Sequence, residues 1–197
     1  SPAGSTAAAR GPGPDFVVRA GEPYPDAPGE SHLRNVRQLT FEGENAEAYF
    51  SFDGTRLVYQ RTPHGADRSE ACDQIYTVDL ATGEERMVST GEGRTTCSYF
   101  YPDGERVLYS STHLADATCP APPDFSRGYV WAVYPGYDVF VTELGADGGE
   151  SAGGLTRLTE TPGYDAEATF SPTGDRIVFT SVRDGDLDLY SMAPDGS

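Results

Sequence analysis

The sequence has no lysine, only three cysteines and three histidines, and no long run of apolar residues. All fourteen basic residues are arginine, whereas aspartate and glutamate together number 31, so the formal net charge is −17. Nucleic acid and anionic membrane surfaces would repel such a chain, which excludes both as expected partners. A membrane-spanning helix needs roughly 18 or more apolar residues in succession, and no such run exists, so we predict no membrane span.

Recognisable catalytic motifs are also missing. The sequence contains no Gly-x-Ser-x-Gly elbow, no His-Glu-x-x-His pair and no phosphate-binding loop. A serine nucleophile needs a positioned base, and His32, His64 and His113 all fall in or beside predicted loops. We therefore predict that the chain is not an enzyme and that it needs no cofactor.

The first thirty residues differ in composition from the rest. Residues 1–30 are rich in Pro, Gly, Ala and Ser, which predicts a flexible tail or linker. The opening segment, 1–9, resembles what remains after an export signal or a lipid anchor is removed, and it is also what an arbitrary boundary would leave. It favours a periplasmic or extracellular protein, lipid-anchored before processing.

The remaining residues contain one phrase three times. Its fullest form is Ser171-Pro-Thr-Gly-Asp-Arg-Ile-Val-Phe-Thr-Ser-Val-Arg-Asp-Gly-Asp-Leu-Asp-Leu-Tyr190, and shorter forms begin at Ser51 and Tyr101. Each form has a tight turn with a short strand before it and further strands after it. The expected strands are 46–50, 56–60, 74–80 and 85–89 in the first unit, 96–100, 106–110, 137–144 and 156–159 in the second, and 166–170, 176–180 and 187–192 in the third. None shows helical periodicity, so the sequence predicts an all-β repeat.

The units are longer than a simple repeat. Their turns lie 50 and 70 residues apart, against roughly 40–45 residues for a four-stranded propeller blade. The excess falls between the second and third strands, in insertions over 61–73 and 112–136. The longer insertion carries the only tryptophan, Trp131, with Tyr129 and Tyr134 beside it. Long loops with many aromatic residues are often functional, so these three residues are candidate binding residues.

The phrase from Ser171 to Tyr190 resembles the TolB-type, WD40-like propeller repeat of bacterial envelope proteins. The resemblance implies blades over about 31–197, divided into 41–89, 90–159 and 160–197, as about half of a six-bladed ring. It also implies an exported protein that binds a protein or peptide without catalysis. The same repeat occurs in front of peptidase domains, so the alternative is an accessory propeller that admits substrate to a separate catalytic domain.

Three blades would leave sheet edges open. The short strand Val36–Thr40 fits the closing strand of a last blade, and the end of the chain leads into a further strand. We therefore expect the third blade to be incomplete, and the open edges to be covered by remaining blades or by a second copy.

The topology of a blade gathers several reactive residues on one face. Because successive strands are antiparallel, the start of the first strand, the end of the second and the start of the third share that face. It receives Glu47, Cys97 and Glu167, which are equivalent positions in the three units, together with both insertions. With Asn45 and Asp165 two residues before the glutamates, these carboxylates would make a negative channel mouth that attracts cations or basic peptides. The alternative is that they are solvated strand ends that discourage edge pairing.

The three cysteines lie on the same face. In an oxidising compartment, Cys72 or Cys97 would pair with Cys119 and pin the long insertion, leaving one thiol free. A metal site built from His64, His113, Cys72, Cys97 and the carboxylates is the alternative, but no CxxC or HxxxH spacing supports it. The acidic stretch 184–188 lacks the glycine and the final glutamate of a calcium loop, so we expect a turn there. We predict no metal.

Overall fold

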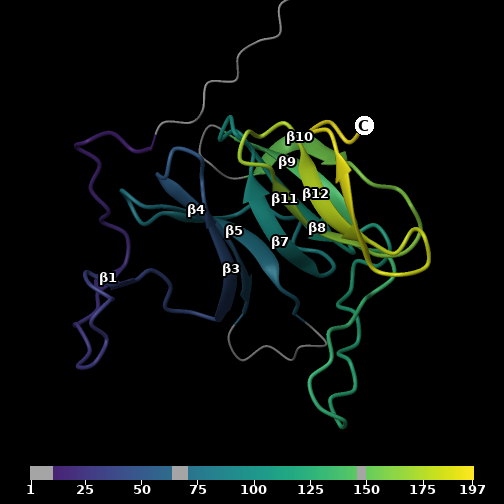
Figure 1. Ribbon diagram of the computed structural model, residues 1–197, viewed down its shortest axis with the longest axis horizontal. Coiled ribbons are helices and arrows are strands. Elements are labelled where there is room, and N and C mark those ends of the chain that lie inside the picture. Colours follow the sequence, from purple (N-terminus) through teal and green to yellow (C-terminus); the bar gives the residue numbers. More distant parts are fainter. Residues whose placement is uncertain (1–10, 64–70, 146–149) are drawn as a thin grey trace, which may run out of the picture.

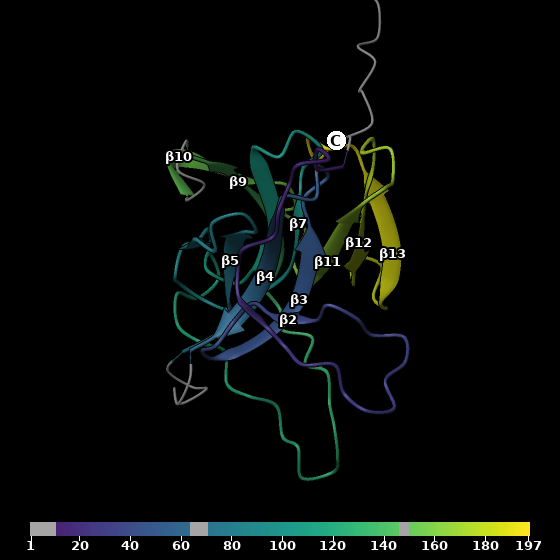
Figure 2. The same ribbon diagram turned by 90° about the vertical axis from the view of Figure 1, so that its left-hand side faces the viewer.

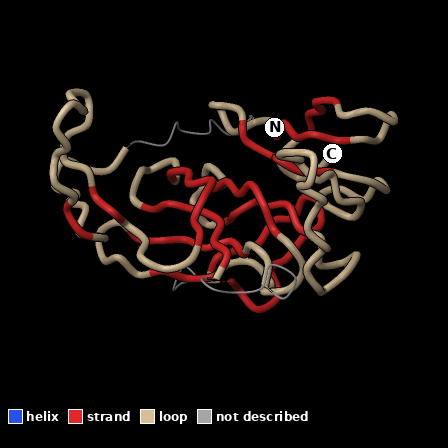
Figure 3. The backbone as a smooth tube through the Cα atoms, turned by 90° about the horizontal axis from the view of Figure 1, so that it is seen from below, coloured by secondary structure: helices blue, strands red, loops and turns tan. Residues whose placement is uncertain are grey.

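The computed structural model describes residues 11–63, 71–145 and 150–197. These residues form strands, turns and loops (Figure 3). None of them forms a helix long and apolar enough to cross a membrane. The strands lie in three blade-like antiparallel sheets, side by side, with one additional two-stranded ribbon (Figures 1 and 2).

Each sheet follows the order of the sequence. Blade 1 contains β3 (Glu44–Phe50), β4 (Arg56–Thr62), β5 (Gln74–Asp79) and β6 (Glu85–Met87). Blade 2 contains β7 (Thr95–Phe100), β8 (Arg106–Ser111), β9 (Asp138–Leu144) and β10 (Glu150–Arg157). Blade 3 contains β11 (Asp165–Phe170), β12 (Ile177–Ser181) and β13 (Asp188–Met192). The all-β fold is as the sequence predicts, and the strands lie close to their expected positions except β10, which begins six residues earlier than the expected strand over 156–159.

The recurring turn joins the first two strands of every blade. Gly54, Gly104 and Gly174 occupy equivalent positions with φ of 70°, 72° and 72°. Their amides donate to the carbonyl oxygens of the residues three positions earlier, at 2.8–2.9 Å. Only glycine adopts this left-handed conformation at little cost, which explains why it recurs at this point of each unit.

Strand β8 shows why the blades stack. Val107 and Tyr109 point toward blade 1, where they pack with Val58 and Ile75. Leu108 points the other way and packs in the core shared with blade 3. Because successive side chains of a strand face opposite sides, a strand between two blades must be apolar on both faces. Strand β8 is accordingly buried along almost its whole length.

Two cores result from this stacking. The core between blades 1 and 2 consists of Val58, Ile75, Val88, Phe100, Val107, Tyr109 and Phe140. The core between blades 2 and 3 consists of Tyr101, Leu108, Val139, Val141, Ala168, Phe170, Ile177, Phe179 and Met192. At roughly 1.5–3 kcal/mol for each fully buried large apolar side chain, these cores are the main source of blade cohesion.

The first strand of every blade carries a bulge at the same place. The pairing register breaks between Ala46 and Tyr49, and at the equivalent positions in β7 and β11. The bulged residues Glu47, Cys97 and Glu167 have φ of 53°, 46° and 58°. A β-bulge redirects its side chain and interrupts the ladder, and here it does so three times on adjacent inner strands.

The N-terminal segment differs from the flexible tail expected over 1–30. Ala20 is 1% exposed and packs with Phe16 against blade 1, next to Leu57 and Leu80. The amides of residues 19 and 20 both donate to the Leu80 carbonyl oxygen, at 2.8 and 3.0 Å. That prediction is therefore wrong for residues 16–23, because apolar surface on blade 1 provides a partner that composition could not reveal. Residues 1–10 lie outside the described residues.

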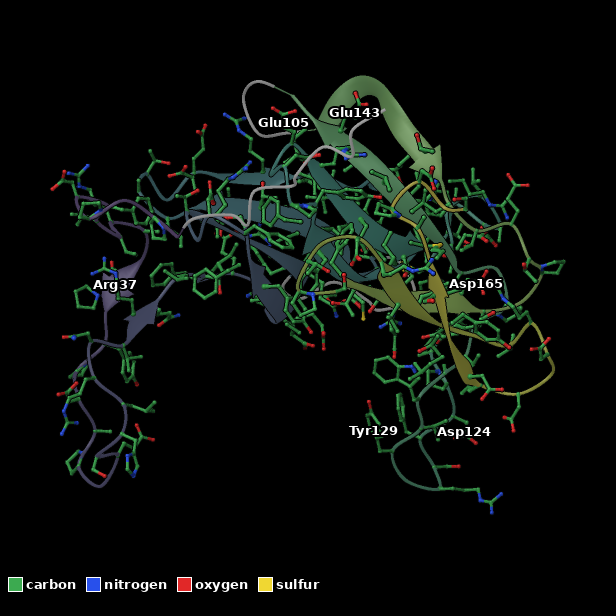
Figure 4. All side chains as sticks on the ribbon, turned by 45° about the horizontal axis from the view of Figure 1, so that its top comes forward. Arg37, Glu105, Asp124, Tyr129, Glu143 and Asp165 are labelled. Carbon is green, nitrogen blue, oxygen red and sulfur yellow. A yellow bond between two sulfur atoms is a disulfide. The ribbon has the colours of Figure 1, made fainter. Side chains whose placement is uncertain are left out.

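The expected closing strand over 36–40 is also placed differently. Strand β2 (Arg37–Gln38) pairs with β1 (Glu22–Pro23) and not with a blade. The Arg37 guanidinium fixes this ribbon by donating to the carbonyl oxygens of Ala20 and Gly21, at 2.9 and 2.8 Å (Figure 4). In this structure the segment stabilises the N-terminal ribbon.

Blade 3 packs on blade 2 through one face only. Tyr190 and Met192 lie on the packed face, in or against the shared core. On the opposite face Leu189 is 76% exposed, and Leu187, just before the strand, is 48% exposed. Large apolar side chains with this exposure form a surface that a further layer could cover.

Candidate functional site

The long insertion between β8 and β9 projects from one end of the blades (Figures 1 and 2). Cys119 in the insertion forms a disulfide with Cys72, which precedes β5 in blade 1, and their Cα atoms are 5.6 Å apart. The Tyr134 hydroxyl donates to the Ala121 carbonyl oxygen at 2.9 Å, which ties the two arms of the loop together. Figure 4 shows Asp124 and Tyr129 on this projection. The insertion is therefore attached to both of the first two blades.

A pocket of about 180 Å³ lies between the insertion and the blades. The insertion contributes Pro122, Pro123, Phe125, Tyr129, Val130, Trp131, Ala132 and Tyr134 to its walls. The blades contribute Gln60, Asp73, Arg94, Thr96, Tyr137 and Tyr164. We call this the insertion pocket. All three aromatic candidates from the sequence, Tyr129, Trp131 and Tyr134, line it.

An ion pair forms the polar part of the insertion pocket. The Arg94 guanidinium lies 2.9 Å from the Asp73 carboxylate, and Asp73 is 9% exposed. Asp73 also accepts a hydrogen bond from the Thr62 hydroxyl. The Arg94 guanidinium carbon lies 6.0 Å from the centre of the Tyr134 ring, at the limit of a cation–π contact. Arg94 thus connects the carboxylate of blade 1 to the insertion.

Two buried tyrosines complete the pocket. The rings of Tyr137 and Tyr164 meet edge to face, with centroids 5.5 Å apart. Burial raises the pKa of both phenols far above their usual value. Both hydroxyl groups therefore stay protonated at neutral pH, and the Tyr164 hydroxyl donates its hydrogen to the Glu167 carboxylate.

A second pocket, of about 300 Å³, adjoins the first. It is lined by Glu47, Tyr49, Cys97, Ser98, Tyr99, Trp131, Glu167, Ala168 and Thr169, which include all three bulged residues. We call this the bulge pocket. The Tyr49 hydroxyl donates to the Glu47 carboxylate at 2.8 Å, and the Tyr164 hydroxyl donates to the Glu167 carboxylate at 3.3 Å. Trp131 lines both pockets, so the two are neighbours on one surface.

The structure separates Asn45 and Asp165 from these pockets. Asp165 is 1% exposed and pairs with the Arg183 guanidinium at 3.3 Å, within blade 3. The Asn45 side-chain amide donates to the Glu42 carbonyl oxygen at 2.9 Å. Neither residue lines the insertion pocket or the bulge pocket. Their expected place at a channel mouth is therefore not observed, because local partners engage both side chains.

The other reactive residues are also dispersed. Cys97 is a free cysteine, and burial raises the pKa of its thiol to about 11, with the nearby Glu47 and Glu167 adding to the effect. His113 packs on Phe140, with ring centroids 4.4 Å apart, and burial lowers its pKa. His64 lies outside the described residues. Among the described residues, no three His, Cys, Asp or Glu side chains gather as metal ligands would.

The blade residues of the insertion pocket were not singled out from the sequence: Gln60, Asp73, Arg94, Thr96, Tyr137 and Tyr164. Most of them stand just before or at the end of a strand, on the face that the topology identifies. A usable signal was therefore present, since Asp73 and Tyr137 immediately precede the third strands of their blades. Polar residues at such positions are so common, however, that nothing in the sequence favours these over others.

No protein-family model matches the chain. Among curated proteins, it is 45% identical over 49 residues to the Tol-Pal system protein TolB of Bordetella pertussis. The TolB proteins of Bordetella parapertussis and Bordetella bronchiseptica match over the same length and at the same identity. Each match covers 23% of this chain and 11% of the relative, so the similarity spans about a tenth of those proteins.

Solved structures extend the similarity over most of the chain. TolB from Acinetobacter baumannii superimposes with a TM-score of 0.55 at 20% identity, covering 81% of this chain and 33% of that protein. Puromycin hydrolase gives a TM-score of 0.55 at 17% identity, covering 88% of this chain and 25% of that protein. At such identities the likeness shows the fold alone, and that fold is a β-propeller of four-stranded blades.

Proposed function

Starting from these TolB-like β-propeller blades, we propose that the chain is a non-catalytic scaffold that binds an extended peptide segment of a protein partner. The observation that carries this proposal is the insertion pocket. Its walls combine prolines and aromatic residues with the half-buried Arg94–Asp73 ion pair. Aromatic-lined grooves bind proline-rich or aromatic peptide segments, and Trp, Tyr and Arg dominate the energetics of protein interfaces.

The volume of the insertion pocket favours a peptide side chain as its ligand over a cofactor or a drug-sized molecule. Its volume is about 180 Å³, whereas pockets for cofactors and drug-sized ligands usually measure roughly 300–1,000 Å³. One side chain of a partner would fill it. The main chain on either side of that side chain would then lie across the exposed surface of Tyr129, which is 81% exposed.

The disulfide supports a location outside the cytoplasm. A bond between Cys72 and Cys119 persists in oxidising compartments such as the periplasm or the extracellular space. The TolB relatives named above point to the bacterial envelope. We therefore assign the chain to the periplasm or the extracellular space, where the partner would also reside.

Remaining blades or a second copy would cover the open face of blade 3. Leu187 and Leu189 lie exposed on that face, and an apolar sheet face without a partner favours association. The alternative function, an accessory propeller of a hydrolase, has no specific support in the described residues. The likeness to puromycin hydrolase concerns the fold.

The proposed function can be tested by peptide selection. A random peptide library is selected on the oxidised protein, and the enriched peptides are synthesised and titrated by calorimetry. Peptides containing proline or an aromatic residue are expected to bind. Trp131→Ala or Tyr134→Ala should lower the affinity for these peptides about tenfold, as for hot-spot residues. Tyr24→Ala removes another exposed aromatic side chain, 58% exposed in the N-terminal ribbon region, and should have no effect. Equal binding by all variants would refute the proposal.

A further inference from the structure

The bulge pocket has a composition that selects one kind of side chain. Two carboxylates, Glu47 and Glu167, come from blades 1 and 3 and line a single cavity of about 300 Å³. Cys97 lines the same cavity from β7 of blade 2, and β7 contacts both β3 and β11. Trp131, Tyr49 and Tyr99 supply aromatic surface around the same cavity.

Within the described residues, neither of these carboxylates forms an ion pair. Among the described residues, arginines pair with Asp73, Glu85, Asp103, Asp138 and Asp165, but none pairs with Glu47 or Glu167. Each of the two accepts one hydrogen bond from a tyrosine hydroxyl. An ionised carboxylate has about four acceptor positions, so both retain acceptor capacity toward the cavity.

Ser98 provides a second, independent indication that the bulge pocket binds a ligand. This residue lines the bulge pocket and is 1% exposed. Its hydroxyl oxygen is buried without a hydrogen-bond partner in the structure. Buried polar groups normally have a partner, and an unpaired one is costly, so a donor-rich group in the cavity would relieve it.

We infer that the bulge pocket binds the guanidinium group of an arginine residue in the same peptide that enters the insertion pocket. A guanidinium has five donors for the carboxylates and a flat face that stacks on aromatic rings such as Trp131. Because Trp131 lines both pockets, neighbouring side chains of one extended peptide can reach both. This inference rests on the proposed function for the peptide, but the cation site itself can be tested separately.

The test uses Trp131 as its own reporter, since it is the only tryptophan. Its fluorescence is titrated with L-argininamide and with L-citrullinamide, which has the same shape without the guanidinium charge. Argininamide should bind about tenfold more tightly, as expected for charge-assisted hydrogen bonds. The variant with Glu47→Gln and Glu167→Gln should lose this preference.

The control variant carries Glu105→Gln and Glu143→Gln, which change the net charge equally. Both glutamates lie at the other end of the blades from the insertion (Figure 4). This variant should keep the preference for argininamide. Equal affinity for the two amides in the unmodified protein, or an equal loss in both variants, would overturn the cation site. If argininamide binds while the selected peptides do not, the cation site stands and the peptide-binding function fails.

Discussion

Cys72 and Cys119 are joined across 47 residues of sequence, and their bond ties the insertion to blade 1. The two cysteines come from different blades, so the disulfide spans the junction at which the insertion pocket forms. Asp73 follows Cys72 directly and lines that pocket, while Pro122 and Pro123 follow Cys119 closely and form its opposite wall. The covalent bond thus sets the distance between the two walls.

We expect the disulfide to contribute both stability and pocket shape. Replacing both cysteines with serine should lower the free energy of unfolding by about 4 kcal/mol, from the entropy of a closed loop of this length. Urea denaturation followed by circular dichroism measures the change. Cys97→Ser leaves the disulfide intact and should cost less than about 1 kcal/mol. A double serine variant as stable as the unmodified protein would show that the bond adds nothing.

The Cys97 thiol should react slowly with alkylating reagents, because only a small fraction of it is ionised. Burial, with Glu47 and Glu167 nearby, raises its pKa to about 11, so at pH 8 the nucleophilic thiolate is scarce. Relative to an unfolded thiol of ordinary pKa, alkylation by iodoacetamide at pH 8 should be about 100-fold slower, because each pKa unit changes the thiolate fraction about tenfold.

The alkylation rate should continue to rise as the pH increases from 9 to 11, since a raised pKa keeps the thiol protonated over that range. Replacing both glutamates with glutamine should accelerate labelling at pH 8. A rate that levels off near pH 9 would contradict the raised pKa. Mass spectrometry of the labelled peptide provides the measurement.

At the bulged residues, substitution by glycine should not lower stability as it does elsewhere in a strand. Glu167 has φ of 58°, a conformation that costs an ordinary residue about 1–2 kcal/mol and costs glycine almost nothing. Glu167→Gly should therefore preserve or slightly raise stability, whereas Glu167→Val should lower it, because a β-branched side chain tolerates this conformation less well than glutamate does. Thermal unfolding of the two variants distinguishes them.

Glu143→Gly is the matched control, because Glu143 lies in the extended strand β9. There glycine should cost roughly 0.5–1 kcal/mol through backbone entropy. If Glu143→Gly and Glu167→Gly lower stability by the same amount, the left-handed conformation of Glu167 carries no strain.

The open face of blade 3 should make the chain self-associate. Light scattering should give a mass above 21.1 kDa that rises with concentration. Leu189→Glu places a charge on the exposed face and should shift the mass toward the monomer, whereas Leu114→Glu, at a leucine that is 60% exposed elsewhere, should not. The mass of a monomer at every concentration would show that the exposed face of blade 3 does not drive self-association.

Much of the fold could be read from local patterns. The turn at Gly174 and its two equivalents fixed the register, and β-branched and aromatic residues such as Val107 and Tyr109 marked the strand that follows each turn. The N-terminal segment was missed because Ala20 stands among glycines and prolines, and its burial depends on the surface that blade 1 presents. For Asp165, the sequence showed an acidic residue at a strand start, but its partner Arg183 approaches only once the blade has formed.

For the candidate site, the sequence identified Trp131, Tyr129 and Tyr134 from the composition of one loop, and Glu47, Cys97 and Glu167 from their equivalent positions. It left open which cysteine pairs with Cys119, since both candidates lie on the same face. It also gave no reason to choose Asp73 and Arg94, whose contact joins residues from different blades.

The sequence by itself determined the repeated unit, the order of its strands and the face on which the insertions emerge. These depend on turn chemistry and on the alternation of side chains along a strand, which act over a few residues. Only the tertiary structure decided which side chains meet between blades: the partner of Cys119, the ion pair in the insertion pocket, and the convergence of three bulges beside Trp131. Such contacts join residues far apart in sequence, so they exist only after the blades have stacked.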